Sequence, residues 1–192
     1  MYKLINLRLI CLWGEKEINM KETDGTKINW IGAIDSSKLA EIIKAIETGI
    51  KENKTKEVTI LIDSIGGSVN ASLAFYQWIK FNKISLTTVG LSTVASSAVT
   101  VLLAGSKRIC FENTTFLVHR MTYPFDGEMS EYDLEEKTTF FRTGNSKVKT
   151  LYKKETRLSD DEIERLLSKD WIVITAEEAI EKGIVQEIIE LE

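Results

Sequence analysis

The chain contains one histidine, His119, which follows a short apolar run at residues 116–118. The imidazole is the side chain whose ordinary pKa places its charge change near neutral pH, so any acid–base chemistry by an imidazole here depends on His119. A single histidine at the end of a strand is more often structural, with hydrogen bonds to the backbone. Two turns of small residues upstream, Gly-Gly-Ser at 66–68 and Ala-Ser-Ser-Ala at 95–98, favour catalysis instead.

Amide hydrolysis requires a nucleophile, a base, a group that orients the base, and donors for the developing oxyanion. Ser96 lies between a predicted strand and a predicted helix, where its hydroxyl can project and the helix N-terminus has free N–H groups. The N–H of Ser97 is the first candidate oxyanion donor. Gly67 is the second, because a glycine lets the backbone approach a substrate carbonyl closely. The structural alternatives are a tight glycine turn and close helix packing by small residues.

Length and composition bound the class of protein. The 192 residues, 43% hydrophobic and 28% charged, are typical of one soluble domain, and a single proline and no low-complexity linker argue against a domain boundary. The net charge of −4 gives no electrostatic reason to expect nucleic acid or an anionic membrane as a partner. Cys11 and Cys110 stand in apolar segments without ligand spacing, which favours buried free thiols over a zinc site.

No apolar stretch is long enough to cross a bilayer, and the N-terminal residues 1–13 lack the cleavage site of a signal peptide. We therefore expect a cytoplasmic protein.

Strands alternate with helices along most of the chain, which predicts βαβ units and a mostly parallel sheet. The pattern predicts a helix opened by Asp35 or Ser36, a turn over residues 90–96, and a polar connection from about residue 13 to Gly25. An apolar run at 58–62 predicts a strand buried on both faces. The predicted strands are residues 4–12, 27–31, 58–62, 84–89, 107–111, 115–119 and 184–188.

Long charged helices follow from Ser130, with Gly144 expected to kink or interrupt them. Two capping-box pairs, Ser159 with Glu162 and Thr175 with Glu178, place helix starts at residues 160 and 176. A glycine at 183 is expected to end the last helix.

Four segments resemble, in order and spacing, the signatures of the ClpP-like serine peptidases. They are residues 62–69 (IDSIGGSV), 94–98 (VASSA), 117–119 (LVH) and 175–185 (TAEEAIEKGIV). The resemblance covers roughly residues 31–188. It implies an α/β fold of the ClpP/crotonase type, with repeated β-β-α units, a mostly parallel sheet and a protruding handle helix. Residues 1–192 then form a single domain, with divergent N-terminal strands at about 1–30 and the handle at about 125–156.

The resemblance also implies roles for individual residues. Ser96 matches the nucleophile and His119 the general base, while Gly67 and Ser97 match the backbone oxyanion donors. Asp170 is the acid at the place of the third triad member. No metal or organic cofactor is implied.

The connection that follows Asp170, residues 171–174, is about one residue longer than usual in the family. A bulge can absorb such an extra residue. Ser168, Asp161 and Glu177 remain alternative partners for the histidine.

The same resemblance implies polypeptide substrates and a homo-oligomeric ring, usually of seven subunits, with two rings stacked as a tetradecamer through the handle. Residues upstream of about 31 do not match the segment with which the family contacts an ATP-dependent unfoldase, so that partnership is in doubt. Ile65, Arg120 and Met121 depart from the family pattern and change the walls of the peptide cleft. Two alternatives remain: an acyl-CoA enzyme of the related crotonase fold, and an inactive ring subunit or scaffold.

Overall fold

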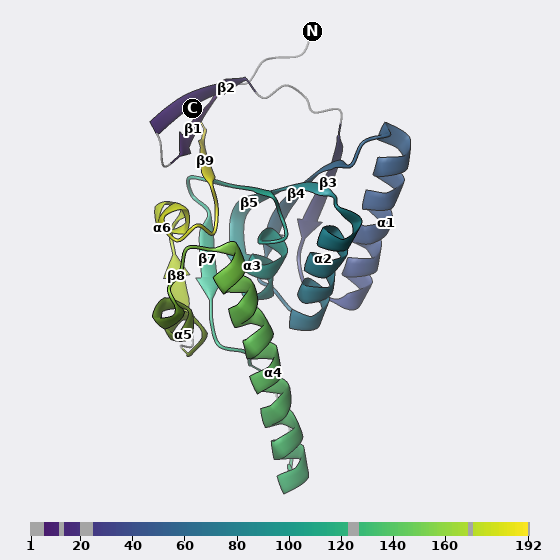
Figure 1. The fold of residues 1–192 in the computed structure, drawn as a ribbon, viewed down its shortest axis with the longest axis vertical. Coiled ribbons are helices and arrows are strands. Elements are labelled where there is room, and N and C mark those ends of the chain that lie inside the picture. Colours follow the sequence, from purple (N-terminus) through teal and green to yellow (C-terminus); the bar gives the residue numbers. More distant parts are fainter. Residues whose placement is uncertain (1–5, 12–13, 20–24, 123–126, 169–170, 192) are drawn as a thin grey trace.

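The computed structural model describes residues 6–11, 14–19, 25–122, 127–168 and 171–191 (Figure 1). The strands of this part of the chain are β1 (Asn6–Cys11), β2 (Gly14–Asn19), β3 (Thr26–Ile31), β4 (Glu57–Ser64), β5 (Ser85–Ala95), β6 (Lys107–Phe111), β7 (Thr115–Val118), β8 (Ile172–Ile174) and β9 (Glu187–Glu190). The helices are α1 (Ser36–Asn53), α2 (Val69–Asn82), α3 (Ser97–Leu102), α4 (Glu131–Glu155), α5 (Asp160–Ser168) and α6 (Ala176–Glu181).

The strands join in one sheet with the order β2-β1-β9-β6-β5-β4-β3, and β7 pairs with both β5 and β8. Five strand pairs are parallel: β3–β4, β4–β5, β5–β6, β6–β9 and β5–β7. The β1–β2, β1–β9 and β7–β8 pairs are antiparallel. The predicted mostly parallel α/β sheet is therefore confirmed, while residues 14–19, predicted to be a polar connection, form the strand that pairs with β1.

Helices α1, α2 and α3 pack against the sheet, and α4 extends away from the body of the molecule (Figure 1). Helix α1 begins after Asp35, whose side chain accepts a hydrogen bond from the N–H of Lys38 (2.7 Å), and this confirms the predicted start. Its buried residues include Ile42 and Ile46, which join the main core.

Strand β4 is buried unequally on its two faces, contrary to the prediction. Val58, Ile60 and Ile62 are at most 2% exposed and belong to the main core. Leu61 points to the opposite face, because side chains alternate along a strand, and is only partly buried in a small second cluster.

Strand β5 continues to Ala95, so the turn predicted over residues 90–96 is wrong. The strand changes partner: its first half pairs with β6 and its second half, from Thr93, with β7. The register against β4 shifts, since Ile62 pairs with Gly90 but Ser64 pairs with Val94. This irregularity hides the strand in the sequence, because bulged strands break the period of two.

Helix α4 runs without interruption through Gly144, which is buried, so the predicted kink is wrong. A Cβ atom on Gly144 would lie 2.6 Å from the Sδ atom of Met121. The glycine therefore permits close packing rather than bending.

The C-terminal helices begin where their capping boxes predict. Ser159 with Glu162 and Thr175 with Glu178 form reciprocal bonds at the starts of α5 and α6. Gly183 follows α6 with a φ of +69°. The last strand begins at Glu187 rather than at residue 184, because the backbone from 184 to 186 bonds back to α6 and to β6.

Candidate active site

Ser96 lies at the junction of β5 and α3 in a strained backbone conformation, with φ 56° and ψ −124°. A residue other than glycine in such a region costs about 1–3 kcal/mol and persists only where its surroundings hold it. The N–H of Ser96 donates to the carbonyl of Leu117 in β7 at 2.7 Å. The sharp strand-to-helix turn leaves the Ser96 side chain partly exposed at the edge of a pocket.

The glycine turn after β4 packs directly on the Ser96 turn. Gly66 has a φ of +96°, and a Cβ atom there would lie 2.7 Å from both the Ala95 carbonyl oxygen and the Ser96 Cβ. Gly67 has a φ of +148°, and its Cβ would lie 2.3 Å from the carbonyl oxygen of Ile34. Only glycine fits at either position, which explains the pair in the sequence.

Two backbone N–H groups are free at this junction. Ile34 donates to the Gly66 carbonyl (2.9 Å) and accepts from the Ser68 N–H (2.7 Å), which leaves the Gly67 N–H between them without an acceptor in the described residues. Ser97 is the first residue of α3, and a helix provides no acceptor for its first N–H groups. Both residues line the pocket beside Ser96.

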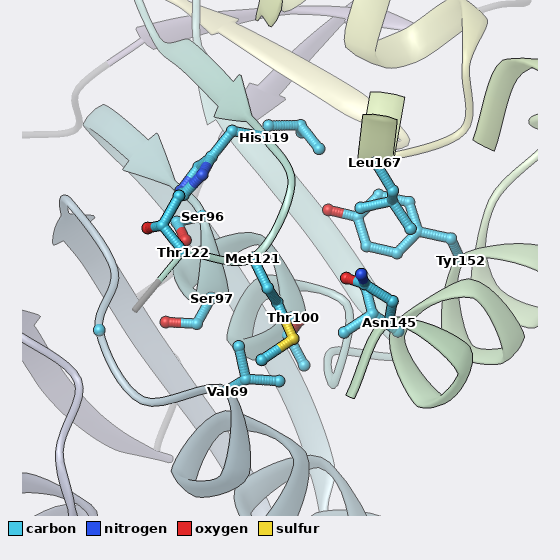
Figure 2. A pocket seen from close by; sticks show the side chains of 13 residues that line it. Val69, Ser96, Ser97, Thr100, His119, Met121, Thr122, Asn145, Tyr152 and Leu167 are labelled. Carbon is cyan, nitrogen blue, oxygen red and sulfur yellow. The ribbon is translucent and has the colours of Figure 1, made fainter. Parts of the chain in front are cut away.

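His119 follows β7 and lines the same pocket as Ser96 (Figure 2). The pairing of Ala95 with Leu117 fixes this proximity, because it aligns the ends of the two parallel strands. Within the described chain, neither the Ser96 hydroxyl nor the His119 ring makes a hydrogen bond. Catalytic hydrogen bonds are often long in the absence of substrate and shorten in the complex.

The His119 ring stacks on Trp171, with ring centroids 4.3 Å apart and an interplanar angle of 29°. The β7–β8 register, in which Val118 pairs with Ile172, accounts for this contact because it brings residue 171 opposite residue 119. Sequence reasoning missed Trp171, which it treated only as part of a lengthened connection. The available signal was the short apolar run that begins at Trp171, which could have been interpreted as a strand that pairs with the strand before His119.

Asp170 falls outside the described residues, so its predicted place behind His119 is not described. The three alternative orienting residues lie elsewhere: none of them is among the described residues that line the pocket. The Ser168 hydroxyl donates to the carbonyl of Arg165 (3.2 Å), and Asp161 is exposed in the first turn of α5. Glu177 is exposed at the start of α6, where a hydrogen bond with Thr175 lowers its pKa.

Helix α4 supplies a wall of the pocket that sequence reasoning did not foresee. Asn145, Val148 and Tyr152 line it, opposite Ser96 and Ser97, and the cavity has a volume of about 90 Å³. A water molecule needs roughly 10–15 Å³ on this measure, so the cavity can hold several waters or a substrate side chain. The composition predicted long charged helices here, and the resemblance implied a protruding handle, but neither indicated that this segment lines the pocket.

Comparison with protein families matches residues 16–192 to the family described as Clp protease. The match extends further toward the N-terminus than the resemblance from about residue 31, and it begins within β2. The chain belongs to the Clp protease family, and its mixed α/β fold with a mostly parallel sheet agrees with that family. Membership points to a peptidase.

No helix of the described chain is long and apolar enough to cross a membrane. The same residues contain no group of three or more metal-ligating side chains.

Proposed function

We propose that this protein is a serine endopeptidase that hydrolyses extended polypeptides through an acyl-enzyme, with Ser96 as nucleophile and His119 as general base. The observation that carries the proposal is the convergence at one pocket of the strained Ser96, the His119 ring and the free N–H of Gly67. Membership of the Clp protease family supports it.

The first step joins the Ser96 oxygen to the substrate carbonyl carbon while the hydroxyl proton passes to His119. The carbonyl oxygen becomes an oxyanion, which the N–H groups of Gly67 and Ser97 stabilise. The carbon–nitrogen bond then breaks as His119 returns the proton to the leaving amine. A water molecule, deprotonated by His119, attacks the resulting ester and releases the carboxylate and the free serine.

Asp170 remains our proposed partner for the other nitrogen of the imidazole. Its carboxylate would hold the productive tautomer and stabilise the imidazolium, while Trp171 restrains the ring from its face. The two contacts are compatible, because a stack covers the face of a ring and a hydrogen bond meets its edge.

We propose further that the chain assembles into a ring, as the family generally does, with seven subunits per ring and two rings stacked through α4. Exposed side chains on that helix support this role: Tyr132 is 85% exposed, Leu134 55% and Phe140 46%. Surface side chains of this kind favour burial against another protein. Light scattering of the purified protein tests the assembly, and a persistent monomer would contradict it.

A fluorophosphonate probe, read by intact mass, tests the catalytic proposal. The wild-type protein is expected to gain one label, and Ser96→Ala to gain none. Ser92→Ala is a matched control, because Ser92 is an exposed serine in the same strand, and it should label normally. Assembled wild-type protein without a label on Ser96 would favour an inactive ring subunit instead.

A further inference from the structure

The pocket beside Ser96 extends to α4. The wall that α4 forms has two polar side chains, Asn145 and Tyr152. Asn145 and Tyr152 are seven residues apart on α4, about two helical turns, so both face the same side of the helix. Figure 2 shows the Asn145 amide and the Tyr152 hydroxyl directed into the pocket, across from Ser96 and Ser97.

This wall offers an occupant an acceptor on Asn145 and a donor on Tyr152 that no described residue engages. The Oδ1 atom of Asn145 is buried and has no hydrogen-bond partner among the described residues. Tyr152 is 2% exposed, and its hydroxyl makes no hydrogen bond within the described chain. Burial raises the pKa of the Tyr152 hydroxyl, so it stays protonated and can donate.

Apart from His119, the remaining described lining has no basic or acidic side chain. Met121, Val148 and Leu167 contribute apolar surface, and none of the described lining residues is an aspartate, glutamate, lysine or arginine. A charged side chain would therefore enter the pocket without a counter-ion, which is unfavourable in a buried site. A purely apolar side chain would leave the buried Asn145 acceptor unpaired.

The substrate position follows from the proposed chemistry. Ser96 attacks the carbonyl carbon of one substrate residue, and the oxygen of that carbonyl faces the N–H groups of Gly67 and Ser97. The side chain of the same substrate residue then lies next to this pocket. The occupant is thus the side chain on the acyl side of the cleaved bond.

We propose that the pocket selects a carboxamide side chain, glutamine in particular, and that Asn145 and Tyr152 determine this specificity. The amide N–H of the substrate donates to Asn145 Oδ1, and the amide oxygen accepts from the Tyr152 hydroxyl. A carboxamide is the side chain that presents a donor and an acceptor together without charge. This inference rests on the proposed function for the position of the substrate.

The test measures binding in the absence of catalysis. Three peptides that differ only at the acyl-side residue, as glutamine, methionine or glutamate, are titrated into the Ser96→Ala protein. The single imidazole signal of His119 in the NMR spectrum reports occupancy. We expect the glutamine peptide to bind about 3- to 10-fold more tightly per hydrogen bond gained than the methionine peptide, which has similar length and no donor. The glutamate peptide should bind most weakly.

Two variants assign the preference to its residues. Asn145→Leu and Tyr152→Phe, each in the Ser96→Ala protein, should each reduce the glutamine-to-methionine ratio by about 3- to 10-fold. Tyr152→Phe retains the buried ring, so it tests the hydroxyl alone. Ser146→Ala is the control, since Ser146 is the exposed neighbour of Asn145 on α4 and should leave the ratio unchanged.

Equal binding of the glutamine and methionine peptides, or a ratio that neither variant changes, would overturn the inference. That failure is distinct from failure of the proposed function, which is a wild-type protein that the fluorophosphonate does not label at Ser96. A glutamine preference without labelling would support the specificity of the pocket and contradict the peptidase.

Discussion

The unfavourable backbone conformation of Ser96 lies directly against the neighbouring glycine turn. Gly66 contacts the carbonyl of Ala95 and the Cβ of Ser96 at distances that exclude a side chain. The proposed nucleophile therefore packs against a residue that has no functional group of its own.

Gly66→Ala is expected to slow fluorophosphonate labelling by about 100-fold, since a displacement of about 1 Å at a reacting atom can have that effect. Gly32→Ala is the matched control: Gly32 has a φ of +93°, close to the +96° of Gly66, but a Cβ there meets nothing within 4 Å. Both variants should lose about 1–3 kcal/mol of stability from the backbone strain alone. Equal labelling rates in the two variants would contradict the role of the contact.

Trp171 acts as a positioning residue in this scheme, through its stack on His119. Trp171→Ala should slow labelling of Ser96 by about 2- to 12-fold, the equivalent of an aromatic stack worth 0.5–1.5 kcal/mol. Trp171→Phe should restore most of the labelling rate, because it keeps an aromatic ring against the imidazole.

A merely structural tryptophan would give a different pattern. Its removal would lower the thermal midpoint while the rate of labelling of the folded protein stayed unchanged.

At the scale of elements, buried Arg108 joins segments that the sequence separates. It is 7% exposed, and its guanidinium donates to the backbone carbonyls of Ile184 (2.8 Å), Gly183 (3.0 Å) and Glu155 (2.9 Å). The Glu155 carboxylate lies 3.6 Å from the same group. Desolvation lowers the pKa of Arg108, and the Glu155 charge partly offsets that effect. One side chain thus ties β6 to the end of α4 and to the connection before β9.

Arg108→Met is expected to destabilise the fold by about 3–5 kcal/mol, because it leaves several buried carbonyls without a donor and removes one of the cations beside the partly buried Glu155 carboxylate, which keeps Tyr76 and Lys80 as partners. The neighbouring Lys107→Met is a fitting control. Lys107 pairs with Glu187 at 2.9 Å, but its side chain is 47% exposed, so its loss should cost about 0–1 kcal/mol. Urea denaturation of both variants measures the difference, and similar losses would refute the distinction.

The elements that the sequence predicted well are those specified by local contacts. Three helix starts are specified by residues only three positions apart: the capping pairs of α5 and α6 and the Asp35 cap of α1. Each of these patterns lies within one helical turn, so it can be recognised from the local sequence. Gly67, Ser96 and His119 were selected because their turns and strand end follow an ordered pattern, and the structure brings the three residues to one pocket.

The elements that the sequence did not predict depend on partners far along the chain. The second half of β5 is a strand because β7 pairs with it, and residue 144 is glycine because Met121 packs there. The stack of Trp171 on His119 depends on the register of β8, and the wall that Asn145 provides depends on where α4 lies. None of these contacts leaves a local pattern.

At the scale of the whole molecule, alkaline pH should unfold the protein through a buried thiol. Cys110, which was predicted to be a buried free thiol, is fully buried and free, and burial together with the Glu177 charge raises its pKa from 9.0 to about 12. The unfolded chain then loses this proton near pH 9 while the folded chain keeps it. The resulting stabilisation is complete below pH 9 and declines as the pH rises toward 12.

The free energy of unfolding should therefore fall by up to about 1.4 kcal/mol per pH unit from this thiol in that window. In Cys110→Ala the free energy of unfolding should fall less steeply between pH 9 and 10. Loss of the buried side chain lowers stability by the same amount at every pH, so it does not change this slope. Tyr76 and Tyr152, whose pKa values burial also raises, add to the slope only above their ordinary value of 10.0. Identical slopes between pH 9 and 10 would contradict the assignment to Cys110.

The unbroken course of α4 has one more consequence. Its 25 residues form a rod about 37 Å long, with Tyr152 near one end, Asn145 about two turns further in, and Tyr132 near the other end. In the ring that we propose, contacts made at the Tyr132 end would be carried by one continuous helix to the wall of the pocket. Subunit assembly would then bear directly on the shape of the cavity that receives the substrate.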